Sequence, residues 1–361
     1  MTLAAARPMP RIGLRGLLGR RVRKWTAISS FTLLGLVIVS AYLMPLGYMA
    51  ATSLKDGTQM SDAAAPLYPA KPATFAWQGQ EYPVYNVPTG EGTTHRWALV
   101  DPRREDATFV DPAHPEAGTI EWQGRWRALE PAWQLALNLD NFGTVWQQIN
   151  FGRLLLNTFL IAIIGTLGTL LSSTAVAYGF SRFRFPARNG LFLLLVSTII
   201  LPFQITLIPT FAVFSALGWI GTWLPLLIPH FFANAYNVFL LRQYFLTIPR
   251  EMDEAAMIDG ANPLRVLISV IIPQSIPVLT AVALFHFFFA WNDFFQPLIY
   301  LQGNIEAQPL SVGIASFNAL FYQKPTLIQA AAMMSLVLPV AIFFMAQRAF
   351  MRGIVITGVE K

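Results

Sequence analysis

The stretch Glu254-Ala255-Ala256-Met257-Ile258-Asp259-Gly260-Ala261 decides the fold, because it places charged and small residues between long apolar runs. Pro249 suits the first position of a helix, where its missing N–H costs nothing. Three acidic residues follow within about a turn, where a helix N-terminus favours negative charge. Gly260 can end this helix in the left-handed conformation. Ala256 and Gly260 lie four residues apart, so they share a face that a partner surface could approach closely.

A second helix should follow directly. Asn262 suits its N-cap and Pro263 its first helical position. Apolar residues then continue to Ile272, and Pro273 should end the helix. The sequence therefore predicts a helix, a sharp turn and another helix. We expect this segment to bind another protein.

The composition points to a membrane protein. Of the 361 residues, 55% are hydrophobic and only 12% are charged, whereas soluble domains carry about 25% charged residues. The absence of cysteine excludes disulfides and cysteine metal sites. The net charge of +6 is explained by basic residues beside apolar runs, as in topology determinants, so we expect membrane lipid and no nucleic acid as a partner.

Five apolar stretches predict six membrane spans, because one of them is long enough for two. The first is much longer than the ~7–15 apolar residues of a signal peptide, which favours an uncleaved span. The uncharged run 189–241 would form a helix of about 80 Å, against a hydrocarbon core of about 30 Å, so it predicts two spans with a turn at Gly218 and Gly221. The other expected spans are 25–54, 154–181, 276–301 and 325–347.

Basic clusters place both termini and the stretch around Glu254 on the cytoplasmic side. We therefore expect an all-α polytopic membrane protein. Its expected parts are a basic cytoplasmic N-terminus (1–24), span 1 (25–54), an outer segment (55–140), a core (141–352) with a cytoplasmic loop (247–275), and a cytoplasmic tail (353–361).

Residues 55–140 differ in kind from the spans. They hold twelve acidic against seven basic residues, nine of the 25 prolines and five of the ten tryptophans. Aromatic content of this kind argues against disorder, and short β-type runs between Pro/Gly turns predict a small β-rich extracytoplasmic module. The alternative is a passive loop decoration. The expected strands are Thr74–Gln78, Glu81–Val87, Arg96–Val100 and Thr119–Leu129.

The quoted stretch resembles the coupling loop of bacterial ABC-importer permeases, whose pattern is E-A-A, three residues, G, nine residues, I-x-L-P. Glu254, Gly260 and Pro273 keep this spacing, and Val270 and Ile272 replace the usual Ile and Leu. The residues around Gly260, together with the runs 201–209, 239–245 and 291–299, are similar to the carbohydrate-importer branch. The resemblance covers about residues 135–361.

This resemblance implies the smaller permease half of a type I importer in the bacterial cytoplasmic membrane, moving a sugar by alternating access. The implied partners are a second, homologous permease, two ATP-binding subunits and an extracytoplasmic solute-binding protein. No cofactor or catalytic residue is implied, and the chain lacks a phosphate-binding G-x-x-x-x-G-K-[ST] motif. The implied ATPase-coupling residues are Glu254, Ala255, Ala256, Asp259, Gly260 and Ala261.

Polar residues within the spans are candidates for a translocation pathway. Asp293 is the one acid far into a span, where ionisable groups usually face a cavity, although it could equally end a helix at the outer interface. The pathway candidates are Gln204, Asn234, Asn237, Asn292 and Asp293; these side chains could also bind neighbouring helices. The four histidines have no metal-ligand spacing, and His230 and His286 are more typical of hydrogen-bonded core residues.

Other functions are less compatible with the sequence. An ion-coupled secondary carrier would usually show more acids within its spans. A membrane-embedded enzyme would need His, Asp and Glu clustered at one membrane face. A non-sugar ABC importer remains an alternative, because the sequence does not name the solute.

Overall fold

The computed structural model describes residues 14–89, 92–319 and 322–356. The chain divides into two compact units, residues 1–51 and 52–361. The first is dominated by helix α1 (Leu14–Ser53), whose stretch Arg23–Ser53 is long and apolar enough to cross a membrane. The start of the expected N-terminal segment, residues 1–13, lies outside the described residues, as does the end of the expected tail, residues 357–361.

A β-rich module occupies residues 70–135, inside the segment where the sequence predicts one. Strands β2 (Thr74–Trp77) and β3 (Gln80–Pro88) form a hairpin, and the main sheet has the order β2-β3-β4-β5-β6, with β7 also paired to β3. The remaining strands of the module are β1 (Ala70–Pro72), β4 (Thr94–Pro102), β5 (Asp106–Val110), β6 (Thr119–Gln123), β7 (Glu130–Pro131) and β8 (Trp133–Leu135), with 3-10 turns η1 (Pro115–Ala117) and η2 (Trp126–Ala128). Strand β1 pairs with β8, so the module begins and ends at one ladder.

The module has more strands than the sequence predicts. Strands β1, β5, β7 and β8 were not expected, and the strand expected over Thr119–Leu129 ends at Gln123. The reason is Gly124, whose φ is +150° and whose Cα lies so close to the Trp122 ring that a Cβ would meet it at 2.4 Å. The module's tryptophans are all half-buried, and Trp97, Trp122 and Trp126 pack on the core formed by Val87, Leu99, Ala107 and Phe109.

Helices make up the remainder of the second unit. They are α2 (Gly57–Ser61), α3 (Asp140–Gln148), α4 (Phe151–Arg182), α5 (Arg188–Ser197), α6 (Phe203–Ala216), α7 (Leu224–Leu227), α8 (Ala235–Thr247), α9 (Arg250–Ile258), α10 (Pro263–Val266), α11 (Ile272–Gln274), α12 (Ile276–Trp291), α13 (Phe295–Tyr300), α14 (Leu310–Ala315) and α15 (Pro325–Ile356). Single turns η3 (Thr198–Ile200), η4 (Ile228–Phe231) and η6 (Ile305–Ala307), the π-helical segment η5 (Leu267–Ile271) and the short hairpin β9 (Asn318–Ala319) and β10 (Tyr322–Gln323) complete it.

Within the described residues, four helical stretches are long and apolar enough to cross a membrane, and counting each of two bent helix pairs as one span brings the number to six. The four are Arg23–Ser53, Phe151–Arg182, Leu224–Thr247 and Pro325–Gln347. The expected third span is a pair, α5 with η3 and then α6, bent by 100°. The bend falls at Leu201 and Pro202, because a residue before proline is driven out of the helical region.

The fifth expected span, 276–301, is interrupted. Helix α12 ends at Trp291, and α13 begins only at Phe295. Helical structure also continues past Pro273, which sits in the first turn of α11, so the second helix of the coupling loop does not end there as predicted. The bend comes at Ser275 instead, where the helices on either side meet at 81°.

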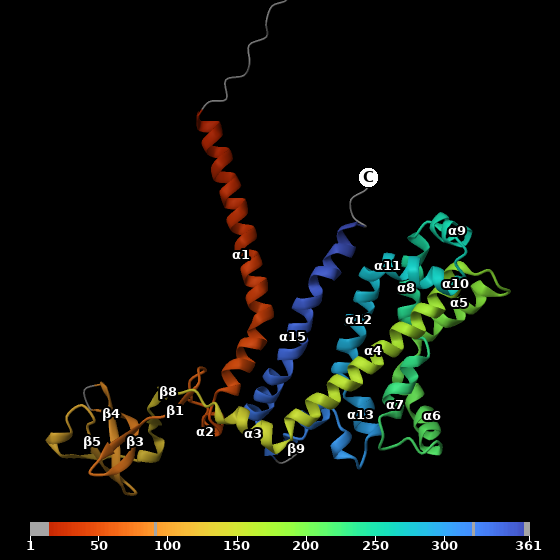
Figure 1. Cartoon of the computed structure of the whole chain (residues 1–361). Helices are drawn as coiled ribbons and strands as arrows, with labels where there is room; N and C mark the ends of the chain where they lie inside the picture. Colours follow the sequence, from red (N-terminus) through yellow and green to blue (C-terminus); the bar gives the residue numbers. More distant parts are fainter. Residues whose placement is uncertain (1–13, 90–91, 320–321, 357–361) are drawn as a thin grey trace, which may run out of the picture. The chain divides into compact units, whose positions relative to one another are not determined.

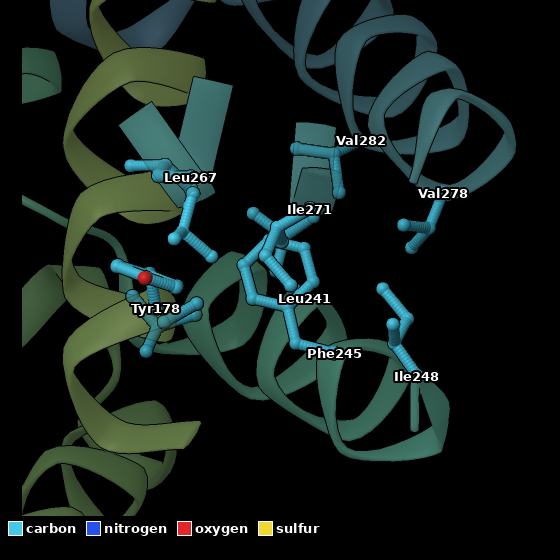
Figure 2. Close-up of a cluster of buried hydrophobic side chains, with 11 residues drawn as sticks. Tyr178, Leu241, Phe245, Ile248, Leu267, Ile271, Val278 and Val282 are labelled. Carbon is cyan, nitrogen blue, oxygen red and sulfur yellow. The ribbon is translucent and has the colours of Figure 1, made fainter. Parts of the chain in front are cut away.

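Helix α4 is the centre of the helical core, and it packs against α12, α8 and η4 (Figure 1). Near the C-terminal end of α4, the largest buried cluster joins α4, α8, η5 and α12 through apolar side chains (Figure 2). Tyr178, Leu241, Phe245, Leu267 and Ile271 all lie in this cluster. The loop 247–275 packs directly on this cluster, because Ala256 and Ala261 contact the same side chains.

Candidate functional site

The turn at Gly260 has the predicted conformation. Helix α9 ends with Asp259 as C-cap, and Gly260 has φ of +84°. The Ala261 N–H donates to the Ala256 carbonyl at 2.9 Å, and the Gly260 N–H donates to the Met257 carbonyl at 3.0 Å, which is the Schellman pattern. A Cβ on Gly260 would meet nothing within 4 Å. Glycine is therefore required by the positive φ and not by a lack of space.

The helix starts also follow the sequence, with one shift. Asn262 caps α10, because its Oδ1 accepts the Arg265 N–H at 2.8 Å. Pro263 occupies the first turn of α10 as expected. Pro249, in contrast, is the N-cap of α9 and not its first residue, since its ψ of 138° is extended.

A buried ion pair ties the turn to α4. Arg182 Nε lies 2.7 Å from Asp253 Oδ2, and both side chains are only 7% exposed. Arg182 Nη2 also donates to the Ile248 carbonyl at 3.1 Å, and Tyr178 Oη donates to the Pro263 carbonyl at 3.1 Å. Burial raises the pKa of Asp253, and the positive charges of Arg182 and Arg250 oppose this rise. The C-terminal end of α4 is therefore attached to the first residues of both α9 and α10.

The outer face of the turn carries exposed apolar side chains beside acids. Ile258 is 87% exposed and Leu264 63%, and Met257 lies beside them at 50%. Glu254, Ala255 and Asp259 are also exposed, whereas Ala256 and Ala261 are turned toward the chain's own core. Ala256 is half-buried against the cluster, whereas Gly260 is exposed, so the two residues are not equally accessible to a partner.

A second candidate region lies at a break in the helical stretch 224–247. Residues 232–234 separate η4 from α8 and are not helical. A cavity of about 610 Å³ opens at this break, within the ~300–1,000 Å³ range of small-molecule sites. Its lining consists of Thr198, Pro225, Pro229, His230, Phe232, Ala233, Asn234, Ala235, Tyr236, Asn237, Phe285, His286, Phe289 and Gln296.

Helix α4 holds the break in place. Ser172 Oγ donates to the His230 carbonyl at 3.0 Å. A Cβ on Gly168 would meet the Phe231 ring at 2.9 Å, so this glycine permits the close approach of η4. The His230 and His286 rings meet edge to face, with centroids 4.6 Å apart, and His286 Nε2 lies 3.1 Å from Thr169 Oγ1.

The five pathway candidates do not lie together. Asn234 and Asn237 line the cavity, and Asn234 also caps α8 by accepting the Tyr236 N–H at 3.0 Å. Asp293 lines a small adjacent space that shares His230 and Phe289 with the cavity, and its Oδ1 accepts the Gln296 N–H at 3.3 Å. Gln204 and Asn292 line neither space; both are exposed, and Asn292 donates to its own helix at the Phe288 carbonyl.

Sequence reasoning missed most of the cavity lining. Phe232, Tyr236, Phe285 and Phe289 gave no signal, because the chain has 28 phenylalanines and ten tyrosines, most of them in apolar runs. His230 and His286 were expected in the core, and His286 is indeed buried and hydrogen-bonded, but both also border the cavity.

Comparison with known proteins covers both regions. The family model described as "Binding-protein-dependent transport system inner membrane component" matches residues 167–355. An osmoprotective compounds uptake permease protein, GgtD, of Synechocystis sp. is 33% identical over 259 residues, which cover 70% of this chain and 85% of that protein. The sn-glycerol-3-phosphate transport system permease protein UgpE of Escherichia coli (strain K12) is 33% identical over 247 residues, covering 66% and 87% of the two chains.

A solved structure shares the fold. A chain of a bacterial ABC transporter involved in the import of the acidic polysaccharide alginate superposes with a TM-score of 0.63, covering 91% of this chain and 98% of that one, at 22% sequence identity. The similarity at this level of identity concerns the fold.

Proposed function

Because the chain belongs to the family of binding-protein-dependent transport system inner membrane components, we propose that it is one of two membrane permease subunits of an ATP-driven importer for a sugar or sugar derivative. Its relatives are permeases named for osmoprotective compounds and for sn-glycerol-3-phosphate. Permease function needs no catalytic residue in this chain, and its own contribution is a pathway and a mechanical link.

The proposed assembly contains this chain, a second homologous permease, two ATP-binding subunits and an extracytoplasmic solute-binding protein. In this proposal both termini and the loop 247–275 lie in the cytoplasm and the module 70–135 lies outside. The basic clusters of the sequence support this orientation, and the six candidate spans, with each bent pair counted once, are compatible with it. ATP binding closes the ATPase dimer, the coupling loop moves with it, and the spans alternate between outward and inward access.

The observation that supports this proposal best is how the coupling loop is attached to the helical core and which side chains it exposes. The Arg182–Asp253 pair and the Schellman turn fix α9 and α10 to α4 and to the cluster of Figure 2. The exposed side chains Met257, Ile258 and Leu264 then form an apolar surface ready for a partner. A loop fixed on one side and apolar on the other transmits a push from the ATPase to a membrane helix.

Substitution of Gly260 tests the link. Gly260→Val forces a β-branched residue to a φ of +84° and should distort the turn, because such residues rarely adopt positive φ. We expect ATP-driven uptake and co-purification of the ATPase subunit to fall at least tenfold, while the chain still inserts in the membrane. Gly303→Val is the matched control, since Gly303 has φ of +81° and open space around its Cα.

The two variants have distinct outcomes. Equal losses in both would mean general misfolding and would remove the support for coupling. Normal uptake and normal ATPase capture by Gly260→Val would contradict the proposed role of the loop.

A further inference from the structure

The cavity at the helix break must face protein or water and not lipid. Residues 232–234 are non-helical within a stretch of helix long and apolar enough to cross a membrane. Hydrocarbon offers no hydrogen bonds, so irregular backbone at membrane depth is tolerated only where it is covered by protein or lines a polar cavity. The exposed aromatic side chains Phe232 and Tyr236 beside the break therefore border a polar space.

Several polar groups in the cavity are unused by the fold. Asn237 is only 6% exposed, yet its side-chain amide has no hydrogen-bond partner among the described residues. Buried polar groups are almost always hydrogen-bonded, so the Asn237 amide requires water or a ligand. The exposed Tyr236 hydroxyl and the half-buried Gln296 amide are accessible donors and acceptors on the same lining.

The lining is neutral. None of the fourteen residues around the cavity is Lys, Arg, Asp or Glu. Phosphate and carboxylate ligands are generally held by Arg or Lys, through charge-assisted hydrogen bonds, and this chain provides neither here. The cavity instead combines four aromatic rings with amide and hydroxyl groups. The electron-rich face of an aromatic ring attracts weakly positive C–H groups, which a sugar ring presents beside its hydroxyls.

We propose that this chain contributes its own subsite for an uncharged polyhydroxylated ligand, a neutral sugar or polyol, at the break between η4 and α8. Tyr236 and Phe289 provide the stacking faces, and Asn237 and Gln296 provide hydrogen bonds to hydroxyls. The subsite excludes sugar phosphates and uronates, because binding would leave their charge without a cationic partner in this half of the pathway. This inference rests on the proposed import function and assigns it a substrate class.

The experiment uses the intact importer with its binding protein in proteoliposomes loaded with ATP. The probes are labelled sucrose, trehalose, maltose and sorbitol, against sn-glycerol-3-phosphate and an alginate disaccharide. We expect uptake of at least one neutral probe and of neither anion. Uptake of either anion, or of no neutral probe, overturns the subsite, whereas failure to assemble with an ATPase subunit overturns the proposed function.

Variants locate the subsite for the neutral probe. Tyr236→Ala and Asn237→Asp should each reduce uptake at least tenfold, with complex yield and basal ATP hydrolysis within twofold of the unmodified importer. Phe239→Ala is the control, since Phe239 lies on the same helix, is 38% exposed and does not line the cavity. Unchanged uptake by both cavity variants, or an equal loss in the Phe239 variant, overturns the assignment of these residues.

Discussion

The coupling loop and the break at residues 232–234 are both interruptions of helical structure, but they are held in opposite ways. The turn at Gly260 is formed by local hydrogen bonds, the Schellman bonds and the Asn262 cap, while Arg182 and Tyr178 of α4 bond carbonyls on either side of it. The break depends on a neighbouring helix, since Ser172 of α4 takes up the His230 carbonyl and Gly168 of α4 gives η4 room. Adjacent residues therefore determine the conformation of the turn at Gly260, whereas the break depends on residues far apart in the chain.

The difference matters for how each region responds to change. The attachments of the loop to α4 include a buried ion pair, Arg182–Asp253, besides the hydrogen bonds from Arg182 and Tyr178. The break has several weak ones spread along α4. We expect single substitutions to release the loop sharply and to alter the break gradually.

The largest effect should come from breaking the ion pair. Arg182→Ala leaves the Asp253 carboxylate buried without its partner, which costs about 3–5 kcal/mol for buried pairs. Asp253→Ala should behave similarly, and thermal unfolding of the purified chain in detergent measures both. Arg184→Ala is the matched control, because Arg184 follows two residues later and is exposed.

The exchanged pair, Arg182→Asp with Asp253→Arg, separates charge from geometry. Partial recovery of the melting temperature and of ATP-driven uptake would confirm that the attraction itself fixes α9. A melting temperature for Arg182→Ala no lower than that of Arg184→Ala would show that the pair contributes nothing to the loop.

A smaller effect is expected at the break. Gly168→Ala places a Cβ 2.9 Å from the half-exposed Phe231 ring, and overpacking of this kind costs about 1–3 kcal/mol. On the same helix, a Cβ on Gly179 meets nothing within 4 Å, so Gly179→Ala should be neutral or stabilising by up to about 1 kcal/mol, the usual helix preference of alanine. Melting temperatures of the two variants, measured side by side, check this; equal values would mean that η4 does not rest on Gly168.

The smallest effect on stability should come from removing the β-rich module. Replacing residues 71–134 with a short Gly/Ser bridge keeps the hydrogen bond that Gln59 donates to the Tyr68 carbonyl and the one that it accepts from the Ala70 N–H. We expect the importer to assemble and to hydrolyse ATP within twofold of normal, but to be stimulated less by loaded binding protein. Unchanged stimulation across a binding-protein titration would identify the module as a passive decoration, a reading that its half-buried tryptophans also favour.

The sequence predicted what adjacent residues decide. The left-handed Gly260 and the Asn262 cap involve hydrogen bonds within a few residues, and the last expected span, 325–347, falls on helix α15, which holds a stretch long and apolar enough to cross a membrane. The Arg182–Asp253 pair could not be predicted from the sequence. The two residues are far apart in the chain, and no local pattern indicates which of the three acids in α9 would pair with Arg182.

The cavity was predicted only in part, for a related reason. Asn234 and Asn237 stand out as polar residues in an apolar run, and both line it. Gln204 stands out equally but faces outward on α6, beyond the bend at Pro202. A sequence shows that a proline bends a helix but not in which direction, so it cannot say which polar residues the bend brings together.

The length of α9 links the loop to the chain's own folding. A helix of nine residues is marginal in water, and the packing of Ala256 and Ala261 on the cluster around Leu241 and Ile271 stabilises it. We infer that an incompletely packed chain offers no docking surface to the proposed ATPase subunit. Only correctly folded chains would then bind that subunit and enter the complex. Newly made chains sampled over time should acquire protease resistance in the bundle before ATPase capture, and capture that comes first would refute this order.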